Sequence, residues 1–203
     1  MATVKQSKTR RLKMAERAEQ LKNLHFPDFP APLVWDRKQH DGFSTIPRTL
    51  PIVMQVIDHQ TKGHAAGHTL FCLWARMPDH PMITIENPTT YAAEAGFSGI
   101  RATDTWRRRM KLLKELSFID SKSGPSGDFH YVLLLNPNVG VEQLRAKGLV
   151  QDELYGRFID RVADVGAMGE IESWKKYQAE LLKRTANEGK APPKAKKISV
   201  KKT

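Results

Sequence analysis

The chain has 203 residues, of which 40% are hydrophobic and 27% charged, and it carries a formal net charge of +11. These values are near the globular averages and exclude a fully disordered chain, a collagen-like repeat and a disulfide miniprotein. Cys72 is the only cysteine, which excludes an intrachain disulfide and a multi-thiolate zinc site. No stretch approaches the roughly 18 apolar residues of a membrane-spanning helix. The basic residues of 1–13 precede no apolar block of a secretory signal. We therefore expect a cytoplasmic protein with no membrane partner.

The excess positive charge lies at the two ends of the chain. Residues 1–24 contain seven Lys or Arg and two acidic residues, and residues 184–203 contain seven and one. Residues 25–183 contain nineteen of each sign and are neutral. Basic arms of this kind commonly bind a polyanion such as nucleic acid through counterion release. The alternative is a solubility tail without a partner.

The first part of the chain predicts two elements before any compact module. Residues 1–24 form a basic helix or a disordered arm, and residues 25–66 hold a connector and the first helix. Three prolines predict an extended connector over residues 26–34. Thr49 is a possible N-cap of a helix with Pro51 in its first turn. The helix has helical spacing of apolar residues at Leu50, Val53, Met54 and Ile57.

Residues 67–137 form a more specific pattern. Leu70, Leu73, Trp74 and Met77 predict a helix that Pro78 ends. Residues 82–86 predict a short strand, and Asn87-Pro88 then supplies an N-cap and a first-turn proline for a short helix ending at Gly96. A turn at residues 96–99 leads into a long helix over residues 100–116, whose buried stripe is Ala102, Trp106, Met110 and Leu113. Residues 118–122 and 129–135 predict a hairpin around a flexible turn at residues 123–128.

This order of elements resembles the winged helix-turn-helix superfamily. The most specific residues are Thr103-Asp104-Thr105-Trp106, the run from Leu112 to Ile119, Gly124 and Tyr131-Val132-Leu133-Leu134. They are similar to bacterial winged-helix regulators and plasmid replication initiators, although Ser117 stands where a glycine is usual in that pattern. The resemblance implies a mainly α fold with a small β-hairpin, in which additional N- and C-terminal helices flank the winged helix.

After the module, we predict a pair of helices in residues 138–183 and a disordered basic tail in residues 184–203. The apolar spacing that marks the pair is Leu154, Phe158, Val162 and Val165, then Ile171, Trp174, Tyr177 and Leu181. The pair either makes a homodimer, docks a protein partner or simply covers the open face of the module.

The resemblance also implies that the long helix enters the major groove of double-stranded DNA. Residues 100–122 contain seven basic and three acidic residues, so positive charge concentrates there within a neutral core. The alternative is a solvated face whose charges pair locally, as Lys111 with Glu115. The candidate contacts are Arg101, Thr103, Asp104, Arg107 and Arg108 for base edges, and Arg109 and Lys111 for phosphates.

Further candidates lie around that helix. Ser98 and Gly99 offer backbone N–H groups to a phosphate at the helix start. Thr89 and Thr90 are phosphate donors or, equally, helix caps. Lys122, Ser123, Ser126 and His130 are candidate wing contacts. Residues 43–46 are a candidate extra strand after the turn at Asp41-Gly42, from which Arg48 would reach DNA.

Enzymatic patterns are weak. His59, His64 and His68 straddle a glycine loop and lack the carboxylate or cysteine that completes a known ligand spacing, so we expect no metal or other cofactor. A metal-dependent nuclease built on these histidines is a distant alternative. Cys72 lies in an apolar helix pattern and is expected to be an inert core thiol.

The sequence therefore predicts a non-enzymatic, sequence-preferring protein that binds double-stranded DNA in the cytoplasm, at the nucleoid. By the resemblance, it would be a transcriptional regulator or a replication or maintenance factor of a bacterial mobile element. The alternative is a winged-helix interaction subunit of a larger nucleoprotein complex, which binds nucleic acid without sequence preference.

Overall fold

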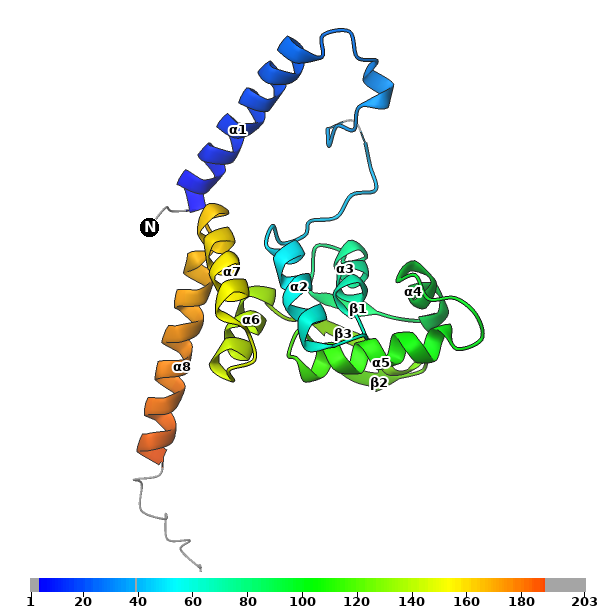
Figure 1. Cartoon of the computed structure of the whole chain (residues 1–203), viewed down its shortest axis with the longest axis vertical. Helices are drawn as coiled ribbons and strands as arrows, with labels where there is room; N and C mark the ends of the chain where they lie inside the picture. Colours follow the sequence, from blue (N-terminus) through cyan, green and yellow to red (C-terminus); the bar gives the residue numbers. More distant parts are fainter. Residues whose placement is uncertain (1–3, 39, 189–203) are drawn as a thin grey trace, which may run out of the picture.

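The computed structural model describes residues 4–38 and 40–188, which form a mainly α protein with a small three-stranded antiparallel sheet. The elements are α1 (Val4–His25), the 3-10 helix η1 (Ala31–Leu33), α2 (Leu50–Gln60), α3 (Gly67–Ala75), β1 (Met82–Thr84), α4 (Pro88–Glu94), α5 (Ala102–Glu115), β2 (Ile119–Gly124), β3 (Gly127–Leu134), α6 (Pro137–Ala146), α7 (Asp152–Asp164) and α8 (Met168–Glu188). Figure 1 shows α4, α5 and the sheet at one end of the protein and α6, α7 and α8 at the other, with α2 between them.

The N-terminal arm is a helix, the first of the two alternatives that the sequence left open. From Met14 to the end of α1 every described side chain is exposed. A long connector joins α1 to α2, as Figure 1 shows. The connector is not extended throughout, since η1 interrupts it. This arm therefore adds nothing to the core from Met14 onward.

The predicted helices α2 and α3 are confirmed, and their packing depends on one side chain and one glycine. Asp58 Oδ1 accepts hydrogen bonds from the backbone N–H groups of Ala66 (2.9 Å) and Gly67 (2.7 Å), which caps the start of α3. A Cβ atom at Gly67 would lie 2.8 Å from Cβ of Met54, so the two helices approach backbone to backbone.

The core of the DNA-binding candidate region is built on Trp106 of α5. Trp106 is 1% exposed and lies between Tyr91 of α4, at 6.3 Å between ring centroids, and Phe129 of β3, at 6.1 Å in an edge-to-face arrangement. Met110 and Leu113 continue the buried stripe, as predicted. One side of α5 is therefore held against α4 and the hairpin together, and the opposite side faces solvent.

The sheet has the order β1-β3-β2, with β3 in the centre. Ile83 of β1 and Ser121 of β2 are both opposite Val132 of β3. The hairpin strands are longer than predicted, and only residues 125–126 form the turn. The extra strand expected at residues 43–46 is absent. That segment runs past the end of α3 instead, where the Ser44 hydroxyl donates to the backbone oxygen of Trp74 (2.9 Å).

Three helices, not the predicted pair, follow the sheet. The missed helix is α6, which Asn136 caps by accepting from the N–H groups of Asn138 (2.9 Å) and Val139 (3.3 Å). Asn136-Pro137 repeats the Asn-Pro start that identified α4, so this signal was present in the sequence. α6 and α7 pack on α2, the helix before the module, and bury Leu144 and Phe158, so both belong to the core.

The last helix also extends further than expected. Residues 184–188 belong to α8 and are not part of a disordered tail. The rest of the predicted tail, residues 189–203, lies outside the described residues.

The end of α5 is closed by a serine in a glycine conformation. The N–H of Ser117 donates to the oxygen of Lys114 (3.0 Å), and the N–H of Phe118 donates to the oxygen of Leu113 (2.9 Å). This is the Schellman arrangement, which needs a positive φ at the residue after the C-cap. Ser117 has φ +63, whereas α4, α6 and α7 end in the same way on glycines, at Gly96, Gly148 and Gly166. The helix thus closes without a glycine, and Ser117 bears the steric cost of the left-handed conformation.

We expect Ser117→Gly to raise the free energy of unfolding by about 1 kcal/mol, because glycine adopts positive φ without the steric cost that other residues bear. Urea unfolding followed by circular dichroism measures the change. Gly148→Ser is the matched reverse variant and should lower the free energy of unfolding by a similar amount. A Cβ there meets nothing within 4 Å, so only the positive φ of Gly148 (+70°) opposes the serine. Equal stability of wild type, Ser117→Gly and Ser117→Ala would contradict the strain.

Candidate nucleic-acid interface

The solvent-facing side of α5 carries several exposed cations. Arg101 at the N-cap, Arg108 and Lys111 are exposed, and within the described residues none of them has a salt-bridge partner. Arg108 makes only a long hydrogen bond to the Thr105 hydroxyl (3.3 Å). The local pair of Lys111 with Glu115, which the sequence left open as an alternative, is not formed. We define the α5 face as Arg101, Asp104, Arg107, Arg108 and Lys111.

Two other cations of this region serve the fold. Lys114 Nζ lies 3.1 Å from Asp120 Oδ1 and donates to the backbone oxygen of Ser121 (3.0 Å), which ties α5 to β2. The backbone N–H of Ser121 and then Lys114 lower the pKa of Asp120. Lys114 is therefore less available to a ligand than the cations of the α5 face.

Arg107 is a residue of the α5 face whose side chain lies beside the wing. Its guanidinium lies 3.7 Å from Asp104 one turn earlier, in an exposed pair of small energetic value. A Cβ atom on Gly127 would lie 3.9 Å from Arg107 Nη2, which places the guanidinium beside the hairpin turn. A ligand in contact with both α5 and the wing would meet Arg107 between them.

Arg109, like Lys114, serves the fold, and it does not lie with Arg108 on the exposed face. Its guanidinium carbon is 5.8 Å from the ring centroid of Phe97, and its Nε is buried with no partner in the described part of the chain. Burial, and then the neighbouring charge of Arg108, lower the pKa of Arg109. Arg109 therefore packs against the turn between α4 and α5, and the expected phosphate contact is left to its terminal nitrogens.

The threonines of α4 meet the start of α5. Thr89 Oγ1 lies 3.4 Å from Thr103 Oγ1, so two predicted contacts are brought together. Asn87, not a threonine, caps α4 by accepting from the N–H of Thr89 (3.1 Å). The hydroxyls of Thr89 and Thr90 thus lie at an exposed surface where they do not act as that cap.

The turn before α5 differs from the prediction in one respect. Because α5 begins at Ala102 instead of residue 100, Ser98 and Gly99 lie two residues further from the helix start than predicted. The turn also holds a residue that the sequence analysis missed, since Ile100 is fully exposed. An apolar side chain at this point suits contact with a thymine methyl group. In the sequence, the position of Ile100 outside the apolar stripe of the long helix was the signal that could have identified it.

Of the four candidate residues of the wing, Lys122 and Ser123 are exposed to solvent. Lys122 is exposed and lies opposite Tyr131 in the hairpin. His130 is buried instead, with Nδ1 3.0 Å from the backbone oxygen of Ile85 and 2.8 Å from Ser126 Oγ. Ser126 also donates to Ile85. His130 and Ser126 therefore hold the hairpin onto the chain after β1. The prediction of a surface contact is wrong for the buried His130, whereas Ser126 is half-buried.

The histidines considered for a metal site are separated. His59 and His64 are exposed, and the ring of His68 stacks on Phe71 at 5.9 Å. Across residues 4–38 and 40–188, no three His, Cys, Asp or Glu side chains gather as a metal ion requires. In the same part of the chain, no helix has the length and apolar character to cross a bilayer.

Comparisons with protein-family models, curated proteins and solved structures find no match to this chain.

Cys72 is a buried thiol whose Sγ lies 3.5 Å from the backbone oxygen of Glu94. Burial, and then the charge of Glu94, raise the pKa of this thiol, so less thiolate exists at neutral pH. We expect Cys72 to react slowly with iodoacetamide in the folded protein and rapidly in urea, as measured by mass spectrometry over time. Equal rates in both conditions would show that the thiol is accessible.

Proposed function

We propose that residues 67–137 are a winged helix-turn-helix that binds double-stranded DNA with sequence preference. The order α3, β1, α4, α5, β2, β3 and the sheet order β1-β3-β2 support this assignment. The observation that carries the proposal is the α5 face, where Arg101, Arg108 and Lys111 lack ion-pair partners within the described residues, next to the exposed Lys122 of the wing. A helix that presents such a face fits the major groove.

In this proposal the contacts divide by chemistry. Arg107 and Arg108 bond the O6 and N7 of guanine, and Asp104 accepts from the N4 of cytosine. Lys111, Lys122 and the adjacent hydroxyls of Thr89 and Thr103 bind phosphates and set the register of the protein on the duplex.

The protein acts by binding, without a catalytic step or cofactor, as a regulator of transcription or as a replication or maintenance factor of a bacterial mobile element. The two basic arms supply general affinity for DNA through counterion release. The proposed role in transcription, replication or maintenance is supported by the resemblance of residues 67–137 to winged-helix regulators and plasmid replication initiators.

The C-terminal helix is the proposed site of a homodimer or protein partner. Only the start of α8 is in the core, since Ile171 is 1% exposed. Further along, Trp174 and Tyr177 stack at 5.8 Å, and Tyr177 is 53% exposed. Figure 1 shows the helix continuing well past the rest of the protein. A symmetric DNA site with half-sites about one helical turn apart would accompany a dimer.

One observation favours the alternative of an interaction subunit. The outer face of the sheet exposes Tyr131 (39%) and Leu133 (40%), which is apolar surface suited to a protein. Footprinting separates the two functions, because only a sequence-preferring protein protects a defined site.

The central test is a selection of bound sequences from a random duplex library, followed by affinity measurements on the preferred site. Arg108→Ala should weaken binding to that site by roughly 1–3 kcal/mol and relax the preference at one position. Lys111→Ala should weaken binding to all duplexes equally and reduce the salt slope, as expected of a phosphate contact.

Arg157→Ala on α7 is the matched control, because it removes an exposed arginine of a helix far from α5 in the chain. It should bind DNA as wild type does. Failure of the library to converge would overturn sequence preference, and unchanged binding by all the α5 variants would overturn the proposed interface.

The C-terminal arm can be tested separately, because α8 ends at Glu188 and the following residues 189–203 hold six lysines and no acidic residue. Deleting 189–203 should weaken binding to all DNA while leaving the preferred sequence unchanged. The magnitude of the salt slope should fall by about 0.9 for each phosphate that the arm neutralises in the wild-type complex. A full salt slope after deletion would make the arm a solubility device.

A further inference from the structure

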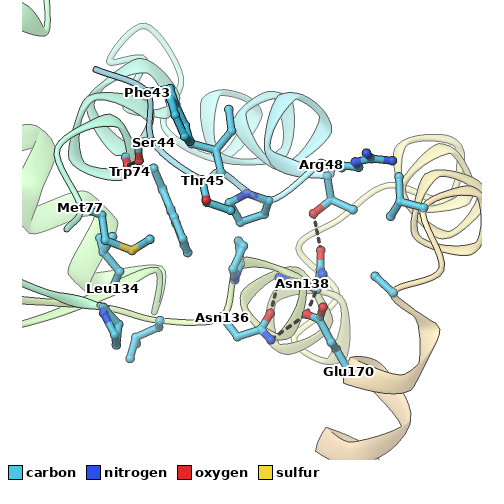
Figure 2. Close-up of a pocket in the computed structure, with 18 of the residues that line it drawn as sticks. Phe43, Ser44, Thr45, Arg48, Trp74, Met77, Leu134, Asn136, Asn138 and Glu170 are labelled. Carbon is cyan, nitrogen blue, oxygen red and sulfur yellow. Dashed lines mark hydrogen bonds between the residues drawn. The ribbon is translucent and has the colours of Figure 1, made fainter. Parts of the chain in front are cut away.

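A pocket of about 930 Å³ lies where the connector before α2 meets the ends of α3 and β3 and the starts of α6 and α8. Its volume is within the range of small-molecule sites. The pocket is separate from the α5 face, none of whose residues lines it. Figure 2 shows Phe43 and Trp74 on one side and Asn136, Asn138 and Glu170 on the other.

The polar wall is prearranged by hydrogen bonds. Thr49, which is 1% exposed, donates from its hydroxyl to Asn138 Oδ1 (2.7 Å), and Asn138 is itself 2% exposed. The amide nitrogens of Asn138 (2.9 Å) and Asn136 (2.8 Å) both donate to Glu170 Oε2. These bonds hold the carboxylate of Glu170 by one oxygen.

The remaining oxygen of Glu170 is what the wall offers to a ligand. Within the described residues Oε1 has no hydrogen-bond or salt-bridge partner. Glu170 lies at the exposed rim of the pocket, and because both amide groups donate to Oε2, the acceptor that remains is the negatively charged Oε1. A ligand group that donates hydrogen bonds and carries positive charge is its natural complement.

The opposite wall is aromatic and incompletely covered. Trp35 is 63% and Phe43 45% exposed, although the two rings meet edge to face at 6.3 Å. Trp74 also lines the pocket, and its Nε1 is buried without a partner in the described part of the chain. Rings left this exposed beside a pocket favour a ligand with a flat apolar body.

We propose that this pocket binds a small aromatic amine, with its ring against Trp74 and Phe43 and its protonated nitrogen on Glu170. The aromatic wall already attracts one cation, since the guanidinium of Arg37 lies 4.7 Å from the Phe43 centroid. Arg37 and Arg48 also line the pocket. An anionic ligand is therefore the competing outcome of the test.

Three probes of nearly equal shape separate these chemistries: 2-phenylethylamine, 2-phenylethanol and phenylacetate. Each is titrated into the full-length, nitrogen-15-labelled protein at neutral pH while the four tryptophan indole N–H signals are followed by NMR. Trp74→Phe assigns the signal of Trp74. The amine should shift that signal and bind about tenfold more tightly than the alcohol, as a charge-assisted hydrogen bond implies. Phenylacetate should bind most weakly.

Two variants test the assignment to Glu170. Glu170→Gln keeps an oxygen for the two asparagines and should weaken amine binding about tenfold while leaving the alcohol unchanged. Glu172→Gln is the control with the same charge change on the same helix, outside the pocket lining. Phe43→Ala, at an exposed ring, should weaken all three probes without unfolding the protein.

Several outcomes would overturn the proposal. Equal binding of the three probes would remove the role of Glu170, and preferred binding of phenylacetate would make this an anion site served by the arginines. The absence of any shift at the Trp74 indole with all three probes would show that the pocket does not take this class of ligand.

Discussion

The arrangement of the candidate DNA-binding surface depends on the burial of Trp106. This one side chain contacts Tyr91 of α4 and Phe129 of β3, and it is 1% exposed. Large aromatic rings contribute much of the apolar area in a small core, and their edge-to-face contacts fix orientation as well as distance. Because α5 is held through Trp106 on one side, its opposite side must present the cations. The positions of α4, α5 and the wing relative to one another follow from this packing.

The positive charge of that surface depends on which cations already form contacts within the protein. Lys114 is bound to Asp120 and Ser121, and Arg109 is partly buried against Phe97. Arg101, Arg108 and Lys111 remain at the surface, where solvent screens them and no side chain of the described residues neutralises them. Surface ion pairs gain little, so an exposed cation costs the fold almost nothing and stays available for a polyanion.

The C-terminal helices are joined to the rest of the protein by polar as well as apolar contacts. The chain of hydrogen bonds from Thr49 through Asn138 to Glu170 links the start of α2 with α6 and α8. Thr49 and Asn138 are buried and satisfy each other, whereas Glu170 lies at the exposed end of the chain of hydrogen bonds, so the buried part of the network favours one placement of α6 against α2. The same bonds shape the polar wall of the pocket, which makes the pocket a consequence of how α6 and α8 dock.

The sequence by itself determined the elements that have strong local signals. The Asn87-Pro88 start of α4, the apolar spacing of α2, α3 and α5 and the existence of the hairpin are encoded within stretches of about ten residues, where capping and periodicity act. Most of the α5 face was predictable for the same reason. Only the tertiary structure decided that His130 is buried, that Lys114 is paired and that residues 43–46 form no strand. The first and third outcomes depend on partners far apart in the chain, Ile85 for His130 and Trp74 for Ser44, and no local pattern records which distant groups will come together. The partner of Lys114 is near in sequence, but it comes within reach only because β2 turns back along α5.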